Sequence, residues 1–231
     1  MVRPRFQRFQ FLQVIRHRRQ SYPQSLAEQE ARVEALLRDQ APPALILTEH
    51  PPIYTIGTSG REEDILAREI DGCRIAVYHT GRGGEVTYHG PGQLLCYLIA
   101  DLRAERDLHR HIHRLEEMII RALADFGLSA GRNPRGIGVW IGGRKIAAVG
   151  VRCRRWVTWH GIALNIAPEL RHFRGIVPCG MRDAPVTSMA ELGRTPDRPA
   201  VEACLIHHAR LLFAPSGDPI HQPRSTRGAH S

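Results

Sequence analysis

The sequence has no long hydrophobic run. None of its stretches approaches the roughly 20 consecutive apolar residues that a helix needs to cross a bilayer. Residues 1–6 also lack the apolar centre and the small-residue cleavage site of a signal peptide. We therefore expect no membrane-spanning helix and a cytoplasmic location. The length of 231 residues and the hydrophobic fraction of 42% are ordinary for one large globular domain.

Cysteine is scarce, and its spacing forms no recognisable pair. The chain has five cysteines, an odd number, and no CxxC motif. This pattern indicates neither a zinc site nor a disulfide framework. We expect mostly reduced and buried thiols at these positions: Cys73, Cys96, Cys153, Cys179 and Cys204.

Acidic residues are outnumbered by basic residues, 23 to 32, which gives a formal net charge of +9. A basic protein often binds nucleic acid, but the arginines here are scattered, and the basic stretch with an aromatic residue at positions 152–156 is short. An acidic protein partner would benefit equally from the complementary field. The charge alone leaves both kinds of partner open.

The pattern of apolar residues predicts an α/β (α+β) fold. Short apolar runs bounded by turn residues predict strands at residues 9–14, 45–48 (running into 49–57), 75–78, 94–99 and 157–166, and a β-hairpin of 138–141 and 144–151 around Gly142-Gly143. These strands are interrupted irregularly by helices, which favours a mixed β-sheet sandwich with flanking helices. We expect one domain over residues 1–213. Residues 214–231, rich in Pro, Ser, Gly and Arg, are expected to form a disordered tail.

Three longer helices and one short helix are expected. The pattern Ser25-Leu-Ala-Glu resembles a capping box and predicts a helix start. Asp107 is placed to cap a helix that Gly127 would end. Residues 201–213 have amphipathic spacing, and the charged residues 61–69 are expected to form a short helix.

A glycine-rich stretch at residues 80–93, TGRGGEVTYHGPGQ, lies between two apolar runs. Glycine allows the backbone to approach a bound molecule and to turn N–H groups toward its oxygen atoms. The stretch lacks the GxGxxG context of a dinucleotide site and the Gly-Lys-Ser/Thr of a P-loop. Its composition fits either a ligand-binding loop or a glycine-rich hairpin without a ligand.

Two residues are candidates for chemistry. Cys179 lies in a Pro/Gly turn, where free N–H groups can activate a thiol, although small buried cysteines are common. Lys145 follows a Gly-Gly turn in an apolar run, and the alternative is a strand-edge lysine whose ammonium reaches water. His109 and His113 have a spacing that zinc can use, but no third ligand is nearby, so we expect them to be exposed.

The pattern RGGxxTYHGPGQ at residues 82–93 resembles that of the lipoyl(octanoyl) transferases, the octanoyl-[acyl-carrier-protein]:protein N-octanoyltransferase family. Further segments resemble the same family: EHPPxYTxG at 49–57, GRKIAAxGV at 143–151, WHGIALNI at 159–166, and PCGM with Val-Thr-Ser at 178–188. Together they span most of residues 45–192. The resemblance implies the fold of the biotin/lipoate protein ligase catalytic domain.

The resemblance also implies an acyltransferase with a Cys/Lys dyad and no cofactor. Cys179 would take the octanoyl group from octanoyl-acyl carrier protein as a thioester, and a lysine of a lipoyl domain would receive it, with Lys145 assisting both steps. Implied acceptors are the lipoyl domains of 2-oxoacid dehydrogenase complexes and the glycine cleavage H protein, with no nucleic acid or membrane partner. The implied substrate-binding residues are Arg82, Gly83, Gly84, Glu85, Val86, Thr87, Tyr88, His89, Ala148, Val149, Gly150, Gly161, Ile162 and Ala163.

Some alternatives stay open at the level of the sequence. Ala148 stands where many relatives carry serine, and His89 and His160 fit either substrate orientation or structural hydrogen bonds. An ATP-dependent lipoate-protein ligase of the same fold is the nearest alternative function. A basic nucleic-acid-binding module is the alternative from a different class.

Overall fold

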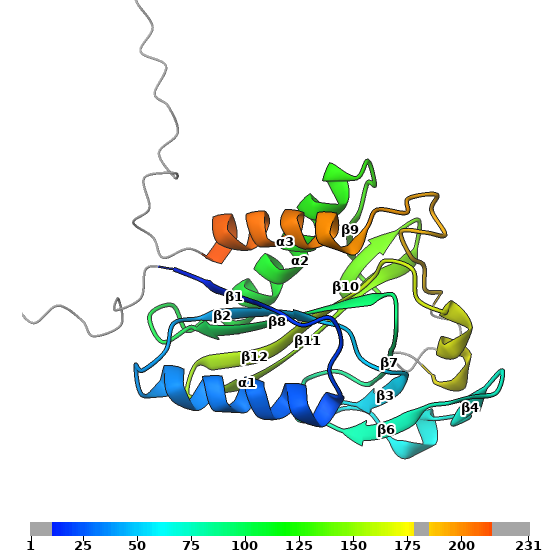
Figure 1. The fold of residues 1–231 in the computed structure, drawn as a ribbon, viewed down its shortest axis with the longest axis horizontal. Helices are drawn as coiled ribbons and strands as arrows, with labels where there is room; N and C mark the ends of the chain where they lie inside the picture. Colours follow the sequence, from blue (N-terminus) through cyan, green and yellow to red (C-terminus); the bar gives the residue numbers. More distant parts are fainter. Residues whose placement is uncertain (1–10, 178–184, 214–231) are drawn as a thin grey trace, which may run out of the picture.

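The structure is a computed structural model that describes residues 11–177 and 185–213. Its largest element is a seven-stranded sheet with the order β1-β2-β8-β12-β11-β10-β9 (Figure 1). Strand β1 pairs with β2 in parallel, and the other neighbours pair antiparallel, so the sheet is mixed as expected. The strands are β1 Gln13–Arg16, β2 Ala44–Thr48, β8 Gln93–Asp101, β12 Val157–Asn165, β11 Arg144–Arg154, β10 Gly136–Ile141 and β9 Gly131–Asn133.

Helices cover both faces of this sheet. Helix α1 (Tyr22–Leu37) lies on one face, and α2 (Leu108–Asp125) and α3 (Arg198–Phe213) lie together on the other (Figure 1). On the α1 side, Val33 and Leu36 pack against alternate residues of the central strands, such as Ile46 and Tyr97. The opposite residues of the same strands join the larger core beneath α2 and α3. The central strands are therefore buried on both faces, which explains their nearly continuous apolar sequence.

A smaller three-stranded sheet, β6-β3-β7, stands at one end of the large sheet. Its strands are β3 Ile53–Ile56, β6 Ala76–His79 and β7 Val86–His89, and it encloses a third core around Tyr54, Tyr88 and Phe173. Two short strands, β4 Glu69–Ile70 and β5 Cys73–Arg74, form a separate hairpin. Short 3₁₀ segments cover Glu62–Asp64 and Leu170–Gly175.

Two expectations about helices are wrong. Helix α1 begins at Tyr22 rather than at Ser25, and Ser25 is buried inside it. Pro23 carries the missed signal, because proline fits only the first turn of a helix. The side chain of Gln24 accepts hydrogen bonds from the backbone N–H and the hydroxyl of Ser21. Residues 61–69 form only a 3₁₀ turn, Glu62–Asp64.

Helix α2 begins and ends near the expected positions, whereas α3 begins at Arg198, three residues before the expected start at Val201. The Asp107 carboxylate accepts a hydrogen bond from the backbone N–H of Arg110 at 2.9 Å, and Gly127, with φ at +73°, follows the end of α2. His109 and His113 are exposed on this helix, as expected. The described residues contain no cluster of His, Cys, Asp and Glu that could hold a metal ion. None of the helices in this part of the chain combines the length and the hydrophobicity needed to cross a membrane.

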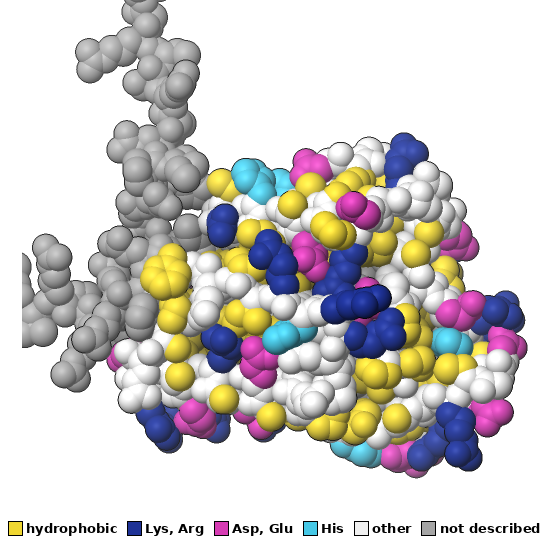
Figure 2. Space-filling model, in the orientation of Figure 1, with side chains coloured by type: hydrophobic (Ala, Val, Ile, Leu, Met, Phe, Trp, Pro, Cys, Tyr) yellow, Lys and Arg dark blue, Asp and Glu magenta, His cyan; other side chains and the backbone are white. Residues whose placement is uncertain are grey.

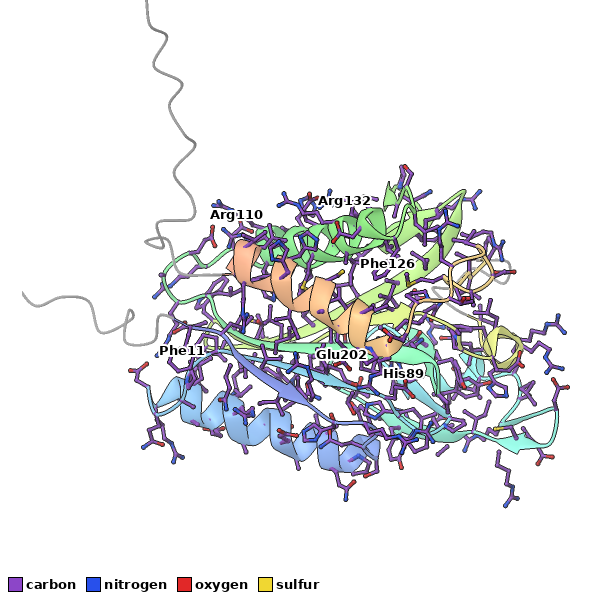
Figure 3. All side chains as sticks on the ribbon, turned by 45° about the horizontal axis from the view of Figure 1, so that its top comes forward. Phe11, His89, Arg110, Phe126, Arg132 and Glu202 are labelled. Carbon is purple, nitrogen blue, oxygen red and sulfur yellow. The ribbon has the colours of Figure 1, made fainter. Side chains whose placement is uncertain are left out.

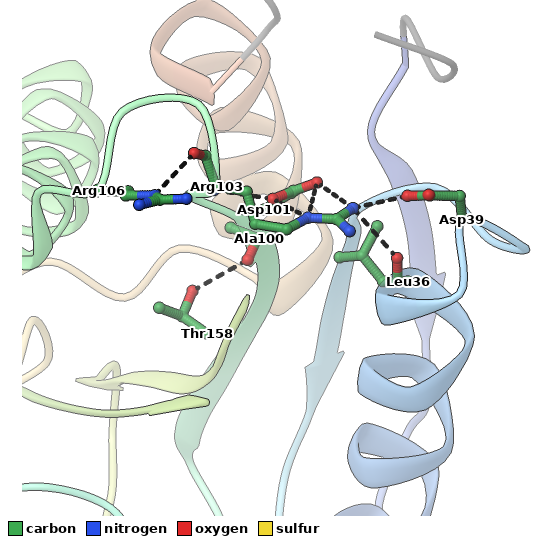
Figure 4. Close-up of polar contacts among 7 residues, drawn as sticks. All are labelled: Leu36, Asp39, Ala100, Asp101, Arg103, Arg106 and Thr158. Carbon is green, nitrogen blue, oxygen red and sulfur yellow. Dashed lines mark hydrogen bonds and ion pairs between the residues drawn. The ribbon is translucent and has the colours of Figure 1, made fainter. Parts of the chain in front are cut away.

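Arg103 ties the end of β8 to the end of α1 (Figure 4). Its guanidinium donates hydrogen bonds to Asp101 at 2.7 Å and to Asp39 at 2.6 Å, and one more to the Leu36 carbonyl at 3.4 Å. Asp39 has a positive φ of 56°, which ends the turn after α1. These hydrogen bonds fix the C-terminal end of α1 against the sheet, at the opposite end of the helix from Tyr22.

Candidate active site

A cavity of about 530 Å³ lies where the small sheet meets β8, β12 and β11. Two ladder pairs of small residues, Ala148 with Ala163 and Gly150 with Gly161, line it on β11 and β12. The loop after β6 comes close to this surface, because a Cβ at Gly150 would lie 2.9 Å from the Gly83 carbonyl oxygen. Gly150 thus permits the close approach of the loop, whose Gly83 N–H donates to the Val151 carbonyl at 2.8 Å, and the small side chains of Ala148 and Ala163 take up little of the cavity.

The structure brings nearly all of the predicted binding residues to this cavity. Those that line it are Arg82, Gly83, Gly84, Glu85, Val86, Thr87, His89, Ala148, Val149, Gly150, Gly161, Ile162 and Ala163. Tyr88 does not line it. Neighbouring side chains of a strand point to opposite faces, so Tyr88 turns away from Thr87 and His89 and into the third core. Its hydroxyl hydrogen-bonds His172 at 2.8 Å.

Lys145 also lines the cavity and is only 9% exposed. Its ammonium lies 4.8 Å from the centre of the Trp140 ring, a cation–π distance. The backbone of Lys145 donates to the Pro185 carbonyl at 2.8 Å and accepts from the Thr187 N–H at 3.0 Å. The segment Pro185–Thr187 therefore runs alongside Lys145, with an isolated β-bridge between Lys145 and Val186. Cys179 itself lies outside the described residues.

A chain of hydrogen bonds fixes the protonation of His89, which Figure 3 shows inside the fold. The Gln93 amide donates to the Tyr88 carbonyl at 3.2 Å and to the Asn165 side-chain oxygen at 2.9 Å. The remaining Gln93 oxygen therefore accepts from His89 Nδ1 at 2.7 Å, and His89 Nε2 accepts from the Thr55 hydroxyl at 3.1 Å. Both ring nitrogens make hydrogen bonds within the protein, so His89 orients the side chains of Gln93 and Thr55.

Burial and nearby positive charge keep His89 neutral. Desolvation, assisted by His50 and Arg82, lowers the pKa of His89 to about 3. The Arg82 guanidinium donates to the Thr55 carbonyl at 2.7 Å and to the Glu85 carbonyl at 2.8 Å. Arg82 thus fastens the glycine-rich loop to β3, and it places its positive charge near His89.

The same network reaches Lys145. The Asn165 amide donates to the Thr187 carbonyl at 2.9 Å, while its oxygen accepts from Gln93. Thr187 is the residue whose N–H pairs with the Lys145 carbonyl. Asn165 and Gln93 therefore connect the glycine-rich block with the segment that contains Thr187 beside Lys145. Both residues lie inside the recognised motifs, although the sequence did not indicate this role.

Four rings in contact lie beside the cavity and are here called the ring wall: Tyr22, His50, Tyr97 and His160. All of them except His50 line the cavity. The centroids of successive rings lie 5.6, 5.9 and 6.2 Å apart. His50 Nδ1 donates to the Gln20 carbonyl at 2.8 Å, so its Nε2 accepts from the Tyr97 hydroxyl at 2.8 Å. Tyr22 lies 28 residues before His50 in a helix, and no sequence pattern indicated its place here.

The two ends of the ring wall have polar atoms without partners. The Tyr22 hydroxyl oxygen and His160 Nε2 are buried and make no hydrogen bond among the described residues. Burial raises the pKa of Tyr22 to about 12 and lowers the pKa of His160 to about 3. At neutral pH the tyrosine is a donor, and the neutral imidazole has one donor and one acceptor.

The chain matches a known family model over most of its length. The model for the lipoyl protein ligase A/B catalytic domain matches residues 21–210. An octanoyltransferase from Rhodospirillum rubrum is 45% identical over 201 residues, which cover 84% of this chain and 91% of the relative. An octanoyltransferase from Paramagnetospirillum magneticum is 48% identical over 191 residues, 80% of this chain and 88% of the relative.

Solved structures share the fold at low sequence identity. The bipartite lipoate protein ligase from Thermoplasma acidophilum superposes with a TM-score of 0.65 at 18% identity, covering 87% of this chain and 82% of that one. A biotin protein ligase from Aquifex aeolicus superposes with a TM-score of 0.54 at 14% identity, covering 89% and 71%. The expected fold class is therefore confirmed.

Proposed function

The chain belongs to the lipoyl protein ligase A/B catalytic-domain family and to its octanoyltransferases, and from this premise we propose that it transfers octanoyl groups through a thioester on Cys179. As an octanoyltransferase it is an acyltransferase enzyme that acts in lipoyl biosynthesis. The proposed donor is octanoyl-acyl carrier protein. The proposed acceptors are lysines on the lipoyl domains of 2-oxoacid dehydrogenase complexes and on the glycine cleavage H protein, all in the cytoplasm.

One observation carries the proposal. The buried Lys145 lines a cavity whose small residues suit an extended chain. Its backbone makes hydrogen bonds with Pro185 and Thr187. These two residues closely follow Cys179 in the sequence. A lysine held in apolar surroundings beside such a segment supports the pairing of an ammonium with a thiol.

In the first step, the Cys179 thiolate attacks the thioester carbonyl of the donor. A new thioester forms on Cys179, and the donor thiol leaves. A free thiol with a pKa near 8.5 is only a few per cent ionised at neutral pH, so a nearby Lys145 ammonium would help. A pKa lowered by about two units corresponds to about 2.7 kcal/mol of stabilisation of the thiolate.

In the second step, the amine of the acceptor lysine attacks the Cys179 thioester. An amide forms, the C–S bond breaks, and the amine must lose a proton. Lys145 in its uncharged form would accept that proton.

The cavity supports binding of the acyl chain. Burial of apolar carbons stabilises the complex by about 0.8 kcal/mol per CH₂, which favours an octanoyl group over very short chains by several kcal/mol. Arg82 holds the covering loop, and Ala148 replaces the serine of many relatives without closing the cavity.

The net charge of +9 suits acidic protein partners. On the face in Figure 2, basic and acidic side chains are interspersed.

The proposal is tested by transfer to a purified lipoyl domain from octanoyl-acyl carrier protein, measured with Cys179→Ala and with Cys153→Ser as the matched control. Cys153 lies at the end of β11 and is partly buried, so its substitution should leave transfer intact. The variant at Cys179 should show no transfer. Turnover by Cys179→Ala at the normal rate, or turnover that needs ATP and free octanoate, would contradict the proposal.

A further inference from the structure

The ladder between β10 and β11 ends early, which leaves part of the β11 edge without a neighbouring strand. Its last pair joins Val139 to Ala147, although β11 continues to Arg154. Two glycines turn β10 away, because Gly136 and Gly138 have φ values of +150° and +132°, a region that is accessible mainly to glycine. A Cβ at Gly138 would also lie 2.6 Å from the Ala147 carbonyl oxygen.

The backbone N–H and C=O groups of Val149 face this edge. Alternate residues of an antiparallel strand direct these groups to opposite neighbours. The hairpin at residues 154–157 has a two-residue turn with positive φ at both positions, and such a turn closes on a hydrogen-bonded pair. Residue 154 and every second residue before it therefore face β12. The others face away, as shown by the Val151 carbonyl, which accepts from the Gly83 N–H at 2.8 Å.

The gap in this edge is one residue long. Strand β10 pairs with β11 as far as Ala147, and the glycine-rich loop contacts it again at Val151. Val149 lies between them, and among the described residues no strand pairs with it on this side. Its residue also lines the cavity. A ligand in the cavity can therefore reach one N–H and one carbonyl of the strand edge.

The gap lies near the reacting centre of the proposed function. A Cβ at Gly138 would lie 3.4 Å from Cε of Lys145 and close to the Ala147 carbonyl. Val149 is two residues, about 7 Å, farther along the strand, so its backbone groups are within about 13 Å of Cε of Lys145. A group that pairs with Val149 therefore belongs to the same bound molecule as a thioester beside Lys145.

The chemistry of the gap limits what can fill it. An acyl chain has no group that pairs with an N–H or a carbonyl, and a longer polypeptide strand would collide with β10 and the loop. A pantetheine arm meets both limits. Its β-alanine unit has a carbonyl about 5 Å and an N–H about 9 Å from the thioester sulfur, at about 1.2 Å per bond as in an extended peptide. Peptide-like groups of this kind pair with exposed strand edges.

We propose that the pantetheine arm of the acyl donor binds across the β11 edge, where its β-alanine carbonyl accepts from the Val149 N–H and its β-alanine N–H donates to the Val149 carbonyl. This inference rests on the proposed function and names the part of the donor that the site recognises. The acyl chain lies on the side of Ala148 and Ala163, and the arm leaves past Leu108 and Ile137, which also line the cavity. Ile137 is 54% exposed, so this side lies at the surface.

A series of octanoyl thioesters tests the two hydrogen bonds. Octanoyl-pantetheine has both β-alanine groups, octanoyl-N-acetylcysteamine keeps only the carbonyl of the two, and the S-pentyl thioester has neither. In the wild type, kcat/KM for transfer to a lipoyl domain should rise by about tenfold at each step, the effect of one good hydrogen bond. Equal values across the series would overturn the inference.

Val149→Pro assigns the first of these steps to the backbone. Proline has no N–H, and a strand tolerates it where the N–H faces away from the paired neighbour. The gain from the S-pentyl thioester to octanoyl-N-acetylcysteamine should disappear, while the gain to octanoyl-pantetheine, which uses the Val149 carbonyl, should remain. Val149→Ala keeps the N–H and should show both gains. A Val149→Pro enzyme that also shows both would overturn the inference.

Cys153→Pro is the matched control. Cys153 also faces away from β12, but it does not line the cavity, so this variant should show both gains. The wild-type series decides the question even where a proline variant does not fold. Acyl carrier protein presents the arm on a protein, and coenzyme A presents it on a nucleotide. Val149→Pro should lower kcat/KM about tenfold for the octanoyl thioesters of both, and a loss confined to one carrier would overturn the inference.

Octanoyl transfer from octanoyl-acyl carrier protein by the wild type separates the two ideas. Its absence is a failure of the proposed function. Normal transfer from this donor, combined with equal kcat/KM values across the thioester series, is a failure of this inference alone.

Discussion

Asn165 joins two motifs that are far apart in the sequence. Its oxygen accepts from Gln93, and its amide donates to the Thr187 carbonyl, so both ends of the side chain are fixed. It is only 4% exposed. The Thr187 N–H donates a hydrogen bond to the Lys145 carbonyl. By holding Thr187, Asn165 therefore also helps to position the backbone of this candidate catalytic lysine.

Asn165→Asp is expected to weaken both stability and transfer. The carboxylate has the same shape but cannot donate to the Thr187 carbonyl, and a lost hydrogen bond at a buried group costs about 1–3 kcal/mol of unfolding free energy. Urea denaturation measures this loss, and octanoyl transfer should fall with it. Asn133→Asp is the control, since Asn133 only accepts a hydrogen bond from the Arg135 N–H. Equal stability of the two variants would contradict the role given to Asn165.

Lys145→Met is expected to slow acyl transfer by about a hundredfold or more while changing the melting temperature little. Methionine keeps the apolar stem against Trp140 but removes the amine. Without the ammonium, the Cys179 thiol should titrate near its ordinary pKa of about 8.5. The rate of thiol alkylation as a function of pH measures this. An alkylation profile identical to that of the wild type would show that Lys145 does not act on the cysteine.

Most individual residues of the candidate site could be predicted from the sequence, because they occur in short motifs. Arg82, His89 and Lys145 are each flanked by glycines or by a fixed apolar pattern, so local sequence indicates them. Tyr22 and Tyr97 could not be predicted. They reach the cavity through ring contacts and a His50 hydrogen bond between residues distant in the chain, which no local pattern encodes.

Among the elements, β12 and β8 are antiparallel neighbours whose backbones come very close at Gly161, a residue that lines the cavity. Gly161 has φ at +156°, and a Cβ there would lie 2.2 Å from the Cys96 carbonyl oxygen. A backbone oxygen cannot move aside as a flexible side chain can. The glycine thus permits the left-handed backbone of His160, with φ at +61°, without separating the two strands.

Gly161→Ala is expected to destabilise the protein by more than about 3 kcal/mol, because it combines a backbone clash with an unfavourable φ. Thermal unfolding followed by circular dichroism measures the change. Gly131→Ala is the matched control, since nothing lies within 4 Å of a Cβ at Gly131 and its φ is not positive. A Gly161→Ala variant as stable as this control would show that the contact between β12 and β8 can relax.

Elements with strong local signals were predicted well, and those that depend on tertiary contacts were not. Helix α2 has a capping aspartate, a clear apolar stripe and a terminal glycine, and Figure 3 shows Arg110 along its outer side. Helix α1 was placed three residues late because a local Ser-Leu-Ala-Glu pattern competed with the true start. The charged residues 61–69 had no apolar face to support a helix.

For the whole molecule, buried histidines link stability to pH. Burial lowers the pKa of His89 and His160 to about 3, the pKa of His111 to about 4, and the pKa of His50 below its ordinary value. The unfolded chain therefore binds more protons below pH 6.5. Stability is fully present above this pH and is lost as the pH falls toward the folded pKa values.

The unfolding free energy is expected to fall between pH 7 and pH 5. Each of these histidines can contribute up to about 1.4 kcal/mol per pH unit below 6.5. Urea denaturation at several pH values gives the slope, and His111→Leu should show a slope smaller by about one proton. A free energy that stays constant or rises over this interval would contradict the neutral, buried state of the histidines.

The sandwich architecture was predictable because strands buried on both faces have nearly continuous apolar sequences. The cavity was not, since it forms where two separate sheets meet. Thr55 and His89, for example, are 34 residues apart and come together only through the pairing of β3 with β7. The predicted tail at 214–231 and the nucleophile lie outside the described residues, so both stay predictions.

Intact-protein mass spectrometry under single-turnover conditions tests the central claim most directly. The protein is mixed with octanoyl-acyl carrier protein without acceptor, and the modified residue is located by peptide mapping. One octanoyl group should appear on Cys179 and disappear when a lipoyl domain is added. An unmodified Cys179 in an enzyme that still transfers octanoyl groups would contradict the account.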